Sequence, residues 1–198
     1  MSTIEPLVKE ALPTITSETS GRTEHIWALP LEQDFLETFL RDMFENHYDK
    51  LTFGPLIPGA AYELKTPGKP QSVTMMDGYM TIHWGAKGHF HLCIGPTYGP
   101  KSNPNPPEII VQRRPSRAEL YRGLGKDGYP TTWGFRMFNG DGQPQITIFM
   151  PNPFIGDDDR LTDVHDFSRV DLWDYVKHRY AGHPPEEFDR LGKGFRQS

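Results

Sequence analysis

The stretch TTWGFRMFNGDGQPQITIFM, residues 131–150, joins two runs of strand-forming residues through the turn-forming sequence NGDG. With NGDG as the loop, Phe135 lies opposite Ile146. Two residues further from the turn, Trp133 lies opposite Ile148, so both strands bring their apolar residues to one face. Turn and pattern therefore agree on an antiparallel hairpin that covers a core on one side.

Both helices and strands are expected on either side of this hairpin. They do not follow the regular alternation of strand and helix that is typical of a parallel sheet. Apolar residues at spacings of three and four predict a helix over 30–49. Further strands are expected over 75–85, 88–95 and 108–112, and further helices from Pro115 and over 168–180. The order predicts an α+β fold, a curved antiparallel β-sheet with helices packed on one face or at its ends.

Composition limits the class of protein. The chain has 198 residues and a net charge of −5 without a basic stripe, which disfavours nucleic acid as a partner. No signal-type segment and no long apolar run occurs, so we expect a cytoplasmic protein without a membrane partner, and a homodimer is left open. We divide the chain into a loosely ordered arm over 1–24, a single domain over 25–185 and a polar tail over 186–198.

The strand GHFHLCIG, residues 88–95, alternates coordinating and apolar side chains. Because successive side chains on a strand point to opposite faces, His89, His91 and Cys93 share one face, and the apolar residues between them share the other. The alternative interpretation is that these histidines are ordinary solvated residues of a sheet. The pattern favours a ligand-bearing strand if the neighbouring strand brings apolar residues to the same face.

The neighbouring strand can take two registers. A loop of two or four residues between the strands places Met80 and Trp84 on the face of His89, which would make a mixed polar and aromatic pocket. A loop of three residues brings His83 to that face instead. The sequence leaves both registers open, so Met80, His83 and Trp84 are all candidate ligand-binding residues.

Three kinds of metal centre are compatible with this strand. A structural zinc site needs a fourth ligand beyond His89, His91 and Cys93, and His165 is the nearest candidate. A non-haem iron site would need a distant carboxylate such as that of Asp163 or Asp166. Haem needs only one or two axial histidines and an apolar slot, so it requires the fewest additional residues.

The hairpin run MFNGDGQPQITIFM, residues 137–150, resembles the hairpin of the cytoplasmic haem-utilisation proteins, the HemS-like and HutX-like carriers. The strands GHFHLCIG and IIVQRR are similar to two further strands of that family. The resemblance implies haem binding, transfer or ring-opening degradation, with His89 near the haem and His91 and His83 as second choices. Thr147 stands where the family tends to carry Lys, and Cys93 where some members carry Arg.

The leading hypothesis from the sequence is therefore a tetrapyrrole-binding protein for haem storage, delivery or degradation. Arg113 and Arg136 are candidate partners for a ligand's carboxylates, because a guanidinium suits bidentate contacts. One alternative is an enzyme that depends on a single Fe or Zn ion held by His89, His91 and Cys93. The other is a protein-interaction module in which the histidines play no part.

Overall fold

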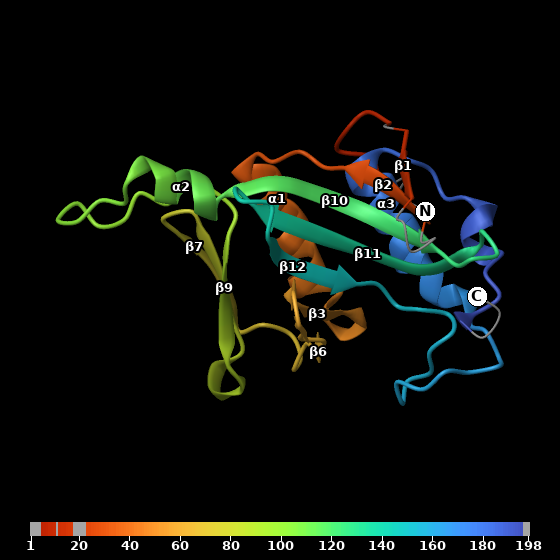
Figure 1. Ribbon diagram of the computed structural model, residues 1–198. Helices are drawn as coiled ribbons and strands as arrows, with labels where there is room; N and C mark the ends of the chain where they lie inside the picture. Colours follow the sequence, from red (N-terminus) through yellow and green to blue (C-terminus); the bar gives the residue numbers. More distant parts are fainter. Residues whose placement is uncertain (1–4, 11, 18–22, 196–198) are drawn as a thin grey trace. The chain divides into compact units, whose positions relative to one another are not determined.

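The computed structural model describes residues 5–10, 12–17 and 23–195 and has the expected α+β architecture (Figure 1). An antiparallel sheet of seven strands runs in the order β1-β2-β10-β11-β12-β3-β6 and is not closed into a barrel, and a second sheet has the order β7-β8-β9. The strands are β1 Thr14–Ser17, β2 Thr23–Ala28, β3 Thr52–Gly54, β4 Leu56–Ile57, β5 Ala60–Ala61, β6 Leu64–Lys65, β7 Ser72–Met76, β8 Tyr79–His83, β9 His89–Cys93, β10 Pro115–Leu124, β11 Pro130–Asn139 and β12 Pro144–Phe149.

The helices are α1 Gln33–Arg41, α2 Pro107–Arg113 and α3 Asp171–Ala181. The helix expected over 30–49 is confirmed, since α1 continues as a π-helical turn over Asp42–Asn46 and buries Leu36, Phe39 and Leu40. A short 3-10 turn, Phe167–Val170, leads into α3, as expected for 168–180. None of the helices in the described segments is long and apolar enough to cross a membrane.

The described chain forms two compact units, each built from separated stretches of sequence. Unit 1 comprises the described residues up to Leu29 with Glu119–Phe135 and those from Phe149 onward, and unit 2 comprises Pro30–Ala118 and Arg136–Ile148. This division cuts across the domain expected over 25–185. Part of the expected arm over 1–24 is the edge strand β1, which pairs antiparallel with β2 from Thr14↔Ile26 to Ser17↔Thr23.

Two neighbouring elements were predicted wrongly, each with the secondary structure of the other. The strand expected over 108–112 is helix α2, which begins with Pro107 at a position where a missing N–H is harmless and carries acidic Glu108 in its first turn. The helix expected from Pro115 is the long strand β10. Its residues from Ala118 to Gly123 are buried without interruption, which is typical of a strand covered on both faces and hides the two-residue period.

The hairpin of β11 and β12 is present, with its register shifted. Asn139 N–H donates to Gln143 O at 2.9 Å next to the turn, and Met150 N–H donates to Trp133 O at 3.0 Å at the other end. The pairing is therefore displaced from the expected one by one residue at the turn and by two residues at the far end. The difference between the two ends means that the ladder takes up one extra residue, as at a β-bulge. The apolar residues Trp133, Phe135, Ile146 and Ile148 are all buried, as expected.

The sheet of β7, β8 and β9 belongs to unit 2 and differs from the single strand expected over 75–85. Asp77 and Gly78 form a tight turn that joins Met76 to Tyr79, and both turn residues have positive φ angles, 47° and 78°. An Asp-Gly pair with two positive φ angles is the usual loop of a type I′ hairpin. The Asp77-Gly78 pair is therefore the sequence signal that divides the expected strand into two.

Candidate functional site

One face of the β7–β9 sheet carries the histidines that the sequence analysis selected. Across β8 and β9, His83 pairs with His89 and Thr81 pairs with His91. Trp84 N–H donates to Gly88 O at 2.9 Å, so the loop is the three residues between them, and the register is the one that brings His83 to the face. We call this surface the histidine face; its side chains are Ser72, Thr74, Met76, Tyr79, Thr81, His83, His89, His91 and Cys93.

Met80 and Trp84, the candidates of the other register, do not lie on this face. A change of register by one residue moves every side chain to the opposite side of the sheet, and both residues are buried there. The Trp84 ring packs against Phe53 and Phe90, each with a centroid distance of 6.0 Å, and its indole N–H donates to Gly68 O at 2.8 Å. These residues form the core of unit 2 and do not line a ligand site.

His89 and His91 are exposed neighbours on β9, and their ring centroids lie 5.1 Å apart at an interplanar angle of 73°. A zinc–nitrogen bond of about 2.0–2.1 Å places an imidazole centroid roughly 3.2 Å from the ion, so two rings at a tetrahedral angle lie about 5.2 Å apart. The observed spacing therefore matches two imidazoles that share one ion.

The hydrogen bonds of the histidine rings determine which ring nitrogens keep a free lone pair for a metal ion. His91 Nδ1 lies 2.7 Å from the Thr81 hydroxyl oxygen, and when Nδ1–H donates to that oxygen the Nε2 lone pair of His91 is free. This arrangement, in which the second ring nitrogen is held by an outer partner, is typical of metal-binding histidines.

His83 is in a different state. Its Nδ1 accepts a hydrogen bond of 3.0 Å from the Gly85 backbone N–H, so the proton of the neutral ring is on Nε2 and neither nitrogen offers a lone pair. The rings of His83 and His89 are also stacked, with an interplanar angle of 21°, and in-plane lone pairs of stacked rings do not converge on one point. His83 therefore supports His89 by packing and is a poor ligand.

Cys93 lies on the same face but is buried, unlike the two exposed histidines. Burial raises the pKa of its thiol, which donates a hydrogen bond of 3.3 Å to Gly95 O. A neutral thiol is a weak ligand, so the expected role of Cys93 in holding a metal is not supported. Among the described residues, no group of three or more His, Cys, Asp or Glu could hold a metal ion within one chain.

The two candidate arginines lie on other elements of unit 2. Arg113 is an exposed residue in the last turn of α2, and Arg136 on β11 lies over the Phe138 ring, 5.8 Å from its centroid. Arg117 lies closer to the same ring, at 3.8 Å. Arg117 and Arg136 therefore pack around Phe138, and the geometry assigns neither of them, nor Arg113, a shared part with the histidines.

A buried cluster of charges in unit 1 was missed by the sequence analysis. Lys177 and Asp189 are fully buried, and Lys177 Nζ lies 2.9 Å from Asp189 Oδ2. Asp189 Oδ1 also accepts from Arg122 at 2.9 Å and from the Trp133 indole N–H at 2.8 Å. A charged residue inside an apolar pattern, as Lys177 is in α3, was the signal that could have revealed the cluster.

Glu186 completes this cluster from the same C-terminal segment. Its Oε2 lies 2.7 Å from Lys177 Nζ and 2.9 Å from Arg122, and 3.4 Å from His183 Nε2. Burial acts to raise the pKa of Glu186, but the bond to Lys177 and the charge of Arg122 outweigh it and lower the pKa from 4.5 to about 2. The segment expected to be a polar tail from 186 is therefore pinned into unit 1 by two carboxylates that neutralise two buried cations.

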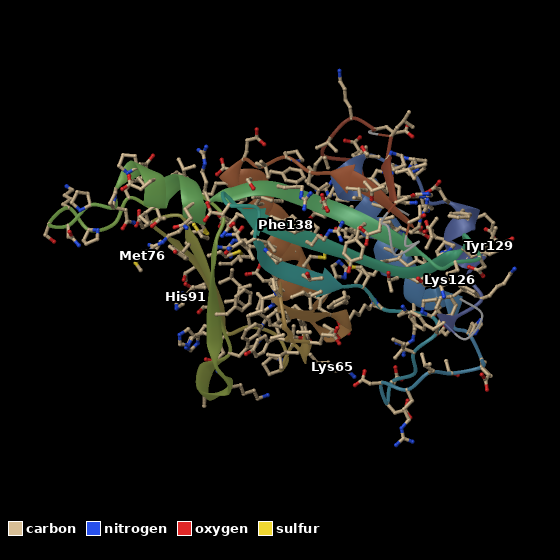
Figure 2. All side chains as sticks on the ribbon, in the orientation of Figure 1. Lys65, Met76, His91, Lys126, Tyr129 and Phe138 are labelled. Atoms are coloured by element: carbon tan, nitrogen blue, oxygen red, sulfur yellow. The ribbon has the colours of Figure 1, made fainter. Side chains whose placement is uncertain are left out.

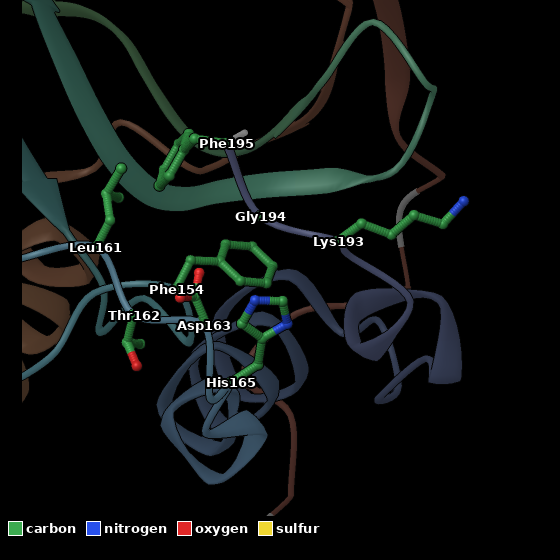
Figure 3. A pocket seen from close by; sticks show the side chains of 8 residues that line it. All are labelled: Phe154, Leu161, Thr162, Asp163, His165, Lys193, Gly194 and Phe195. Atoms are coloured by element: carbon green, nitrogen blue, oxygen red, sulfur yellow. The ribbon is translucent and has the colours of Figure 1, made fainter. Parts of the chain in front are cut away.

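A recess of about 240 Å³ also belongs to unit 1 (Figure 3). His165, the residue considered as a fourth zinc ligand, lines it and packs edge-on against Phe154 with a centroid distance of 4.9 Å. The recess is smaller than the roughly 300–1,000 Å³ of ordinary ligand pockets. The other lining residues are Leu161, Thr162, Asp163, Lys193, Gly194 and Phe195.

The sequence comparison places the chain in a family without adding a function. The chain belongs to the family of unknown function designated DUF7676, which matches residues 13–182. No curated protein matches the sequence significantly. The matched stretch contains the whole histidine face, whereas Glu186 and Asp189 lie beyond it.

Proposed function

We propose that this member of the DUF7676 family binds a first-row transition-metal ion, such as Zn²⁺, Cu²⁺ or Ni²⁺, through His89 and His91. The observation that carries the proposal is the 5.1 Å spacing of two exposed imidazoles whose planes are steeply inclined. Imidazole is a ligand that suits all three ions. Thr81 supports the proposal as the outer partner that orients His91.

The setting of the two histidines favours a small ion over haem, the ligand implied by the hairpin resemblance. Haem needs an apolar slot as well as an axial histidine. Around His89 and His91 the sheet presents Ser72, Thr74 and Thr81, and the aromatic Trp84 lies on the other side. Haem binding at this face is therefore the competing hypothesis, and it predicts a different spectrum.

The proposal is tested by titrating metal-free protein with Zn²⁺ in competition with a chromophoric chelator. We expect His89→Ala and His91→Ala to lose more affinity than the roughly 10- to 100-fold typical of removing an outer partner. Thr74→Val, at an exposed position of the same face, is the matched control and should keep the affinity, because Thr74 carries no ligand nitrogen.

Two results would contradict the proposal. The first is a double variant, His89→Ala with His91→Ala, that binds Zn²⁺ as tightly as the natural chain. The second is a titration with hemin that produces a Soret shift abolished by His89→Ala, which would assign the face to haem. Circular dichroism of every variant confirms that the fold is retained before affinities are compared.

A further inference from the structure

The structure points to a second copy of this chain as the partner of the histidine face. We infer that one metal ion joins two copies, each of which supplies His89 and His91. The inference rests on the proposed function, because it concerns the ion bound at the same two histidines. It adds the partner and the complete set of ligands.

The ligand count of a single chain is too low for a closed site. Structural zinc takes four protein ligands, whereas His89 and His91 supply two. His83 has no lone pair to offer and Cys93 is a buried thiol bonded to Gly95. The side chains of the histidine face include no carboxylate that could supply the missing ligands. Because the described residues supply no third ligand, two coordination positions remain for groups from a second molecule.

The face is shaped for close approach by an equal surface. The row that contains His91 continues through Thr81 to Thr74, and both are short side chains. Met76, at the end of β7, is 77% exposed and adds apolar area to the same face (Figure 2). Because the face carries no lysine, arginine or carboxylate, two copies meet without like charges at the contact.

The area of the face makes the association dependent on metal. A sheet of three strands, each five residues long, covers about 14 Å by 17 Å, or roughly 240 Å². A stable interface buries about 800 Å² per partner, more than three times as much. The net charge of −5 adds a weak repulsion between copies. Without the ion, the contact is therefore too small to hold a dimer.

Symmetry closes the assembly at two copies. When the same face meets itself across a twofold axis through the ion, both copies contribute the same pair of histidines, and the four imidazoles complete a tetrahedron. The contact occupies the histidine face of both partners, so no such face remains for a third copy and no filament forms.

The inference is tested by light scattering coupled to size exclusion, with the full chain at increasing ratios of Zn²⁺ to protein. We expect the 22.7 kDa monomer in EDTA and a species of twice that mass at one ion per two chains. With excess Zn²⁺ the mass falls again, because each chain then takes an ion of its own. His89→Ala and His91→Ala stay monomeric, and the control Thr74→Val dimerises.

A variant outside the ligand pair separates the dimer from the metal site. Thr74→Arg places a long charged side chain in the row of His91 and should abolish the dimer while Zn²⁺ binding remains. If the natural chain binds Zn²⁺ but stays at 22.7 kDa at every ratio, the inference is wrong and the proposed function stands. If Zn²⁺ does not bind, both are wrong.

Discussion

His83 stacks on His89 across β8 and β9, with ring centroids 5.4 Å apart and planes inclined by only 21°. The two residues form a pair without mutual backbone hydrogen bonds, because the adjacent Trp84 and Gly88 are the bonded pair. Cβ atoms approach most closely in pairs of this kind. The stacked ring limits the rotamers of His89 and so holds one of the two proposed ligands in place.

Thr81→Val should weaken metal binding without removing a ligand. The change deletes the hydroxyl that lies 2.7 Å from His91 Nδ1, so the ring loses the bond that orients it. Affinity for Zn²⁺ should fall by about 10-fold, measured by the chelator competition. Thr74→Val, in the same row of the sheet, is the control and should leave the affinity unchanged. Equal affinities in both variants would show that Thr81 does not position His91.

Asp189→Asn should destabilise the fold strongly. The carboxylate accepts from Arg122, Lys177 and Trp133 in the interior, and its neutralisation leaves two buried cations short of charge. Breaking such a buried pair costs about 3–5 kcal/mol, measured as the free energy of unfolding in urea. Glu187→Gln, at an exposed position of the 3-10 turn Glu187–Arg190 that also contains Asp189, should cost less than about 0.5 kcal/mol. Similar losses in the two variants would contradict the role of the cluster.

Stability should depend on Glu186 in acid. The pKa of this carboxyl is lowered from 4.5 to about 2 in the folded chain, so its contribution is complete above pH 4.5 and disappears as the pH falls towards 2. The difference in unfolding free energy between the natural chain and Glu186→Gln should therefore shrink across this window. Denaturation curves in urea at several pH values measure it, and a constant difference from pH 5 to pH 2 would be inconsistent with the lowered pKa.

Gly78→Ala should disrupt the turn that joins β7 to β8. Gly78 has a φ of 78°, and an added Cβ would lie 2.4 Å from Pro96 O. Gly142 has a similar φ of 73° with open space around it, so Gly142→Ala reports the cost of the left-handed backbone alone, about 1–2 kcal/mol. The loss of unfolding free energy should be clearly larger for Gly78→Ala, and equal losses would show that Pro96 can move away.

Elements with strong local signals were predicted correctly. Helix α1 was recognised because its apolar residues recur at helical spacing, and the hairpin of β11 and β12 because turn residues separate two alternating strands. Where burial erased the period, prediction failed, as in β10, whose residues are buried on both faces. Helix α2 failed because seven residues with an Ile-Ile-Val core resemble a strand in any short window.

The buried cluster shows what sequence patterns omit. Arg122 and Asp189 are far apart in the chain, and their pairing depends on a strand and a C-terminal turn that meet only in the folded unit. A polar composition alone made the segment from 186 look like a tail, although Asp189 is fully buried. A charged side chain can be buried only where a partner of opposite charge lies beside it, and such partners come together through tertiary contacts.

The sequence by itself determined that His89 and His91 share one face of a strand, because the pleat alternates side chains regardless of surroundings. Only the tertiary structure decided what lies beside them, since the three-residue loop sets the register of β8 and brings in His83 and Thr81 in place of Met80 and Trp84. Alternation is a local property of the backbone, whereas register depends on the conformation of the loop and on which face of the sheet packs against the core.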